Sequence, residues 1–265
     1  MAVFSLLIIP VELVLVKVVY NSEPKLSQPK VTRAEAASDI SVHNDHSMVS
    51  VLKKKFIQSW IIYYDHRVFL ASIAMACLYF SVLSNGGQMI AVLKYRGVND
   101  LTIVIMRGLG VLTGLAATYI TPLIVSKIGL VRCGLWGLWS QMAFLLPIVI
   151  GFFIQGEHKQ QIETWLLMIG VSLSRFGLWT FDLCETQILQ EQVDNSIAGL
   201  ISGNQYVFFN LGDLCSFLLT LIFSSPEDFY IPSLISIGSV FFGIIFYTSY
   251  VLKERGHLLH FKKSN

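Results

Sequence analysis

The stretch TWLLMIGVSLSRFGLWTFDLCETQ, residues 164–187, decides the fold of this chain. It is long enough to cross a membrane as a helix, which takes about 20 mostly apolar residues. Three of its residues, Arg175, Asp182 and Glu185, nevertheless carry charge. A charge at the centre of a bilayer costs about 2.5–3.5 kcal/mol even on the most lenient scale. The stretch therefore predicts a transmembrane helix whose charged residues have partners on neighbouring helices.

Six further stretches are similarly apolar, and with the first they predict an all-α polytopic membrane protein of seven transmembrane helices. Of the 265 residues 54% are hydrophobic and 14% are charged, whereas a soluble domain has about 25% charged residues. A core of this size cannot hide such an excess, so lipid is expected to cover part of the surface. The six stretches are residues 3–19, 68–93, 101–124, 131–154, 197–223 and 229–252.

The distribution of Lys and Arg predicts the orientation of these helices in the membrane. Residues 21–55 are rich in Ser, Lys, Glu and Asp, which is typical of a flexible loop. With this loop in the cytoplasm, 14 of the 19 Lys and Arg residues lie inside, three lie outside and two lie within spans. The predicted organisation is a helix at 1–20, a cytoplasmic loop at 21–58, a six-helix bundle at 59–253 and a cytoplasmic tail at 254–265.

This layout is typical of the second half of a membrane carrier. Many carriers join two six-helix halves by a long cytoplasmic loop, so the first helix here would be the sixth of such a protein. A seven-helix receptor is the rival, but its first loop is short and neither a DRY nor an NPxxY motif is placed as a receptor requires. No catalytic motif such as HExxH or GxSxG occurs, so an enzyme is not expected. Without a basic stripe, a nucleic-acid partner is not expected either.

Two features within the expected spans are candidate ion sites. The run SNGGQ, residues 84–88, contains Asn85 and Gln88 around two glycines, each of which lowers helix stability by about 1 kcal/mol relative to Ala. A helix broken there would expose carbonyl oxygens near the middle of the membrane, whereas a simple kink is the alternative. Asn210 and Asp213 lie three residues apart on one helix face. Asp213 is the candidate for contact with a cation or proton, or else a structural hydrogen-bond partner.

Arg175, Asp182 and Glu185 lie close to one face of their helix. Arg175 is roughly 10 Å from Asp182 along the axis, which makes direct pairing marginal. The functional interpretation is a gating ion pair that forms in one access state, and the alternative is a permanent clamp. Gly110 and Gly114 form a GxxxG motif that predicts close helix packing. None of the six histidines lies within an expected span, which excludes an imidazole ligand in the membrane here.

Several segments together resemble the ferroportin family of iron exporters, which belong to the major facilitator superfamily. The resemblance runs from the family's sixth helix to its C-terminus and covers nearly the whole chain, but only about half of the family's length. Its strongest segment is RFGLWTFDLCETQILQE at 175–191. The others are VELVLVKVVY at 11–20, SWIIYYDHRVFLA at 59–71, GLVRCG at 129–134 and SSPEDF at 224–229.

The resemblance implies roles for particular residues. Glu12 matches a glutamate that helps to hold a cation in the family's N-terminal half, and Asp213 matches a family aspartate. The family's C-terminal metal site uses a cysteine on the broken seventh helix and a histidine on the eleventh, where this chain has Gly87 and Ser216. Because the same cysteine is central to hepcidin binding in vertebrate members, regulation by hepcidin is not expected.

The function implied by the resemblance is export of Fe²⁺ by alternating access, with no resident cofactor and with Ca²⁺ or a proton as candidate coupling ions. The expected partners are the lipid bilayer, the metal ion and an N-terminal half of the same carrier, and the expected location is the plasma membrane. Two alternatives stay open because the Cys and His ligands are missing. One is a diverged carrier for another divalent metal or a metal chelate, and the other is a transport-dead half that acts as partner or regulator.

Overall fold

The computed structural model describes residues 17, 48–84 and 86–255. The expected first span at 3–19 with Glu12, most of the loop at 21–58, Asn85 and most of the tail lie outside these residues. The chain divides into two units, Met1–Lys53 and Lys54–Asn265, and the second unit holds the helices that build the site.

The described residues are helical and contain no strand, which confirms the all-α class. Five helices, counting η1 and α10 as one, are long and apolar enough to span a membrane, and a bent pair would make a sixth. The elements are α3 (Met48–Asp65), α4 (Phe69–Tyr79), α5 (Gly87–Tyr95), α6 (Asp100–Ile128), α7 (Leu130–Phe153), α8 (Lys159–Gln192), α9 (Ala198–Ile222), the short 3-10 helix η1 (Pro226–Phe229) and α10 (Tyr230–Arg255).

The two ends of α6 illustrate how local sequence sets the helix boundaries. Asn99 accepts a hydrogen bond through its side chain from the Leu101 N–H at 3.2 Å, which caps the first turn. At the other end Gly129 has a positive φ of 87°, a backbone conformation that glycine adopts without steric strain because it has no β-carbon. This one residue both ends α6 and precedes α7, so the two helices must reverse direction within a single turn.

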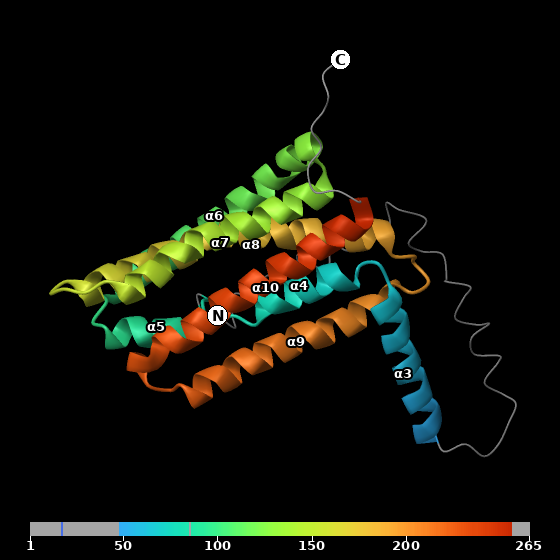
Figure 1. Ribbon diagram of the computed structural model, residues 1–265, viewed down its shortest axis with the longest axis horizontal. Coiled ribbons are helices and arrows are strands. Elements are labelled where there is room, and N and C mark those ends of the chain that lie inside the picture. The colour runs from blue at the N-terminus through green and yellow to red at the C-terminus, as the bar shows by residue number, and fades with distance from the viewer. Residues whose placement is uncertain (1–16, 18–47, 85, 256–265) are drawn as a thin grey trace, which may run out of the picture. The chain divides into compact units, whose positions relative to one another are not determined.

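The bundle consists of two successive helix triplets that pack in matching ways. The first triplet consists of α4 and α5, which count together as one broken helix, followed by α6 and α7. The second triplet consists of α8, α9 and α10. Helix α4 packs against α9 and α10, while α8 packs correspondingly against α6 and α7 (Figure 1). Helices α4 and α8 also contact each other, as do α7 and α10. This pattern is that of the three-plus-three inverted repeat within each half of a major facilitator carrier.

Glycines lie where these helices approach one another. A β-carbon on Gly114 of α6 would come within 2.8 Å of the Trp179 ring on α8, which confirms close packing at the GxxxG motif. A β-carbon added to Gly212 of α9 would lie 2.9 Å from the Ala76 carbonyl oxygen on α4. Contacts at this distance leave no room for a side chain, so small residues permit the helices to approach closely.

The expected span at 68–93 is broken, as the SNGGQ run predicts. Helix α4 ends at Tyr79 and α5 begins at Gly87, so the break starts earlier than the glycines and places Gln88 on α5. The N-terminal side differs from expectation, because α3 already begins at Met48, inside the segment predicted as a loop. Its apolar residues from Phe56 onward make a helix favourable there, and the axis then turns by 102° into α4.

Candidate functional site

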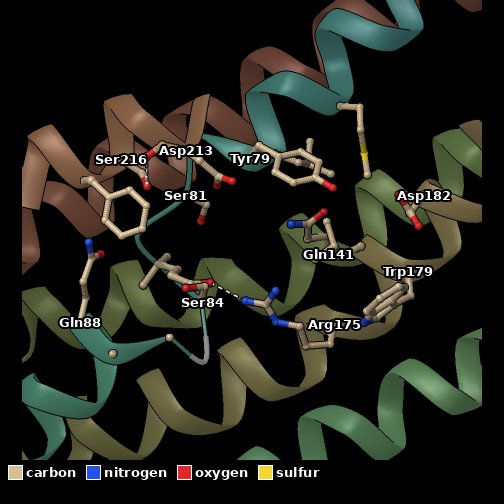
Figure 2. Close-up of a pocket in the computed structure, with 17 residues that line it drawn as sticks. Tyr79, Ser81, Ser84, Gln88, Gln141, Arg175, Trp179, Asp182, Asp213 and Ser216 are labelled. Atoms are coloured by element: carbon tan, nitrogen blue, oxygen red, sulfur yellow. Dashed lines mark hydrogen bonds between the residues drawn. The ribbon is translucent and has the colours of Figure 1, made fainter. Parts of the chain in front are cut away.

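A cavity of about 380 Å³ lies at the break between α4 and α5 (Figure 2). Its walls come from the break itself, α4, α5, α7, α8 and α9, so both triplets contribute. Six sequence-predicted residues line it, namely Gly87, Gln88, Arg175, Asp182, Asp213 and Ser216. The other polar lining residues are Tyr79, Ser81, Ser84 and Gln141, and the apolar ones are mainly Met, Leu, Phe and Trp side chains.

Side chains from neighbouring helices satisfy backbone groups that the break leaves free. The Val82 N–H donates to Ser236 Oγ of α10 at 2.9 Å. The carbonyl oxygen of Leu83 accepts from Arg175 Nη2 of α8 at 2.7 Å. Unwound backbone in a membrane is tolerated where protein groups satisfy it, so these two bonds hold the break open as a defined structure.

Arg175 is therefore bonded to a carbonyl oxygen in this conformation. Within the described residues it forms no ion pair with Asp182 or Glu185, and its Nε has no hydrogen-bond partner. The seven-residue separation from Asp182 accounts for this, because it exceeds the reach of a direct contact along the helix. The guanidinium therefore links α8 to the broken helix.

The two carboxylates of the cavity, Asp182 and Asp213, come from different helices. Figure 2 shows Asp213 and Ser216 on one side of the cavity and Arg175, Trp179 and Asp182 on the other. In the part of the chain that the structure describes, neither carboxylate has an ion-pair partner. With two carboxylates and one guanidinium, the charged groups of the cavity lining have a net negative charge, which favours the binding of a cation.

The donor set of this cavity is oxygen-rich and incomplete. Ser216 donates its hydroxyl hydrogen to the Asp213 carbonyl oxygen at 2.9 Å, and Gly87 contributes no side chain. No group of three His, Cys, Asp or Glu side chains suited to a metal occurs within residues 48–84 and 86–255. Carboxylate and amide oxygens suit hard divalent cations, and they hold transition metals less tightly than Cys or His does.

Gln141 of α7 is a cavity residue that the sequence analysis missed. Its side chain is only 6% exposed, it lines the cavity, and its Oε1 has no hydrogen-bond partner among the described residues. A buried amide oxygen without a partner is costly, so it marks a position where a ligand or a moving donor would be favourable. The available signal was an amide within the apolar stretch 131–154.

Glu185 and Asn210 lie outside the lining of the cavity. Glu185 is 2% exposed and accepts hydrogen bonds from Gln205 Nε2 at 2.6 Å and Ser72 Oγ at 3.4 Å. It thus joins α8 to α9 and α4. Asn210 is exposed and donates through its side chain to the Tyr206 carbonyl oxygen on its own helix at 2.7 Å.

An ion pair between Arg96 and Glu163 ties the far end of the broken helix to α8. Arg96 Nη2 and Glu163 Oε1 are 2.6 Å apart, and the two side chains are 10% and 11% exposed. Arg96 also donates to Thr164 Oγ1 at 3.3 Å. Sequence analysis placed both charged residues in short loops between spans, where nothing indicated that they meet.

Two inverted helix triplets around a cavity at a broken helix have the fold of one half of a membrane carrier. The family model described as Ferroportin1 (FPN1) matches residues 1–240 of the chain. The chain belongs to the ferroportin family.

Curated relatives agree with this assignment. Solute carrier family 40 member 1 of Arabidopsis thaliana is 38% identical over 211 residues, which are 80% of this chain and 40% of the relative. Ferroportin of Homo sapiens is 28% identical over 258 residues, and the match covers 78% of this chain and 45% of the relative. The chain thus spans less than half the length of the curated relatives it matches.

Solved structures share the fold. The outward-facing crystal structure with soaked iron of a bacterial homologue of the iron transporter ferroportin has a TM-score of 0.65 at 24% identity, covering 71% of this chain and 47% of that one. The inward-facing crystal structure of a bacterial homologue has a TM-score of 0.63 and covers 69% of this chain and 45% of that one.

Proposed function

We propose that this chain is the C-terminal half of an alternating-access carrier that exports a divalent metal, with Fe²⁺ as the expected substrate. The observation that carries the proposal is the placement of two carboxylates, Asp182 and Asp213, in one cavity at a broken helix, where neither has an ion-pair partner among the described residues. Such a break near the centre of a carrier half is a usual place for substrate and coupling ions. The family assignment supports metal as the class of substrate.

Asp213 is the proposed principal attraction for the metal in this half. A divalent ion about 4 Å from a carboxylate gains roughly 8 kcal/mol of Coulomb energy at an effective dielectric constant near 20, before desolvation is subtracted. The amide and hydroxyl oxygens of Gln88, Ser84 and Gln141 are the proposed neutral donors. Because this set is incomplete, the rest of the ion's shell would come from water and from the N-terminal half of the carrier, to which the expected first span of this chain, with Glu12 as a proposed ligand, would belong.

Arg175 is the proposed gating residue. It bonds the Leu83 carbonyl in the present conformation, and it shares the cavity with both aspartates. A cation that enters would repel the guanidinium while the carboxylates attract the cation. Movement of Arg175 away from Leu83 would then free the break to change shape, which couples metal binding to a change in α4 and α5. Ca²⁺ or a proton as coupling ion is a further proposal.

The test compares two variants of α9 in a complete carrier. The chain would be joined to the N-terminal half of the Arabidopsis relative, and efflux of radioactive iron from loaded cells would be measured at matched surface levels. Asp213→Ala should reduce efflux by at least tenfold. Asn210→Ala is the matched control, because Asn210 lies on the same helix but is not among the residues that line the cavity, and it should stay within twofold of the parent. Unchanged efflux in Asp213→Ala would mean that the site in this half is structural.

A second function, that of a transport-dead partner or regulator, is favoured because no Cys or His is among the described residues that line the cavity. Gly87 and Ser216 both line the cavity, and neither can bind a transition metal as Cys or His does. Expressed alone, the chain should then leave iron efflux at background while it binds to a full-length relative in a co-purification. Robust efflux by the chain alone would instead require that copies associate into a complete carrier.

The plasma membrane is the proposed location. The rice relative Solute carrier family 40 member 2, chloroplastic, 31% identical over 68% of this chain, makes a plastid envelope the alternative to test. Imaging of the chain with a fluorescent protein at its C-terminus distinguishes the two.

A further inference from the structure

A second and larger cavity, of about 1160 Å³, lies between α6, α7 and α8. Its walls are mostly apolar and include Ile124 and Ile128 of α6 together with Trp136 and Trp139 of α7. Phe176 and Thr180 of α8 also line it. Phe176 follows Arg175 by one residue, a rotation of about 100°, so this groove lies on another face of α8 from the candidate metal site.

The groove exists because α6 and α7 diverge after their shared turn at Gly129. Each of them packs more extensively against α8 than against the other, so α8 forms the floor between them. Trp136 and Trp139 are 67% and 49% exposed, although they are large apolar side chains within a membrane-spanning helix. In a bilayer such a surface contacts lipid, and a groove in it admits an acyl chain.

One basic residue, Arg132, lines the groove near the turn at Gly129. Lys127, in the last turn of α6, is exposed beside the same turn, and none of the described residues that line the groove is acidic. We propose that the groove binds an anionic phospholipid, with the headgroup phosphate at Arg132 and an acyl chain along α7. This site is independent of the proposed metal transport.

The dimensions of the groove fit one leaflet. From Arg132 to Ala143 the lining of α7 advances by eleven residue steps, or about 16 Å at 1.5 Å per residue. The hydrocarbon core of a bilayer is about 30 Å thick, so this length is close to half of it. Positive residues near the turn agree with the predicted cytoplasmic side, where anionic lipids are concentrated. The charged end and the apolar length are therefore in the order that a phospholipid of the inner leaflet requires.

Quenching of Trp136 and Trp139 by brominated lipids tests this proposal directly. The chain would be reconstituted in phosphatidylcholine vesicles that contain equal mole fractions of either brominated phosphatidylglycerol or brominated phosphatidylcholine. Subtracting the signal of the Trp136→Phe, Trp139→Phe variant isolates the groove. We expect the phosphatidylglycerol to quench with an apparent affinity about fivefold higher, the factor that one basic residue near a membrane surface contributes.

Variants distinguish a specific lipid-binding site from general contact with the bilayer. Arg132→Gln should abolish the preference for phosphatidylglycerol, while Arg132→Lys should retain it and show that folding is intact. Ala143→Phe should narrow the groove and reduce quenching by both brominated lipids, whereas Leu146→Phe, outside the groove on the same helix, should not. Equal quenching by the two lipids in the unmodified chain, or a preference that survives Arg132→Gln, would overturn the proposal.

Discussion

Gly177 lies where α8 crosses α7, two residues after Arg175, and this crossing positions one wall of the candidate metal site. A β-carbon at Gly177 would overlap the backbone nitrogen of Gln141 and the carbonyl oxygen of Gly137. Both are main-chain atoms of α7, which cannot rotate away as a side chain would. Gly177→Ala must therefore push the two helices apart, and Gln141 would move away from Arg175 with its helix.

The magnitude follows from two opposing effects. Replacing Gly by Ala within a helix normally stabilises it by about 1 kcal/mol. Overpacking a well-packed crossing costs about 1–3 kcal/mol, and a clash with two backbone atoms belongs at or above the upper end of that range. The net loss is then about 2 kcal/mol, which corresponds to roughly 4–8 °C in the melting temperature for a domain of this size.

The assay is thermal unfolding of the purified chain in detergent, followed by intrinsic tryptophan fluorescence. Gly203→Ala is the matched control, because Gly203 lies on α9 with no atom within 4 Å of its added β-carbon. That variant should melt roughly 2–4 °C above the parent, since only the helix-propensity gain of about 1 kcal/mol remains. If Gly177→Ala melts as high as Gly203→Ala, the close contact of α7 with α8 is refuted.

Three further predictions concern the site and its surroundings. Gly87→Cys combined with Ser216→His should tighten Co²⁺ binding at least tenfold in a calorimetric titration, because soft and borderline ligands are restored, and unchanged affinity would contradict the lining geometry. Arg96→Gln and Glu163→Gln should show a coupling energy of about 1–3 kcal/mol in a double-mutant cycle of thermal unfolding, and additive effects would contradict the pair. An epitope inserted within 155–163 should be labelled on intact cells, unlike one on the C-terminal tail, and the reverse pattern would invert the topology.

Much of the candidate site follows from single residues that are out of place in an apolar helix. Asp213, Arg175 and Asp182 were recognisable because charge in a membrane span is costly, and the structure places all three at one cavity. Asn210 was chosen because it lies three residues from Asp213, yet its amide bonds its own helix and lies outside the lining. Positions three apart differ by about 60° around the helix axis, so residues on roughly one face can still have different neighbours, and only the packing of the other helices decides which of them lines the cavity.

The sequence alone predicted the all-α class, the five apolar spans that correspond to α6–α10, and the break near residues 84–88, but it missed α3, which begins at Met48 within the predicted loop. These properties depend on local chemistry, namely the length of apolar runs, the cost of buried charge and the weakness of glycine in a helix.

Only the tertiary structure decided which groups meet. It joined Arg175 to the Leu83 carbonyl, placed Gln141 in the cavity with its Oε1 unbonded to any described residue, and paired Arg96 with Glu163. It also showed that the Glu185 carboxylate accepts hydrogen bonds from Gln205 and Ser72 and does not pair with Arg175. Contacts between helices depend on their rotation and crossing, which the glycine contacts of α4, α7, α8 and α9 set, and no local pattern in one helix encodes the position of the next.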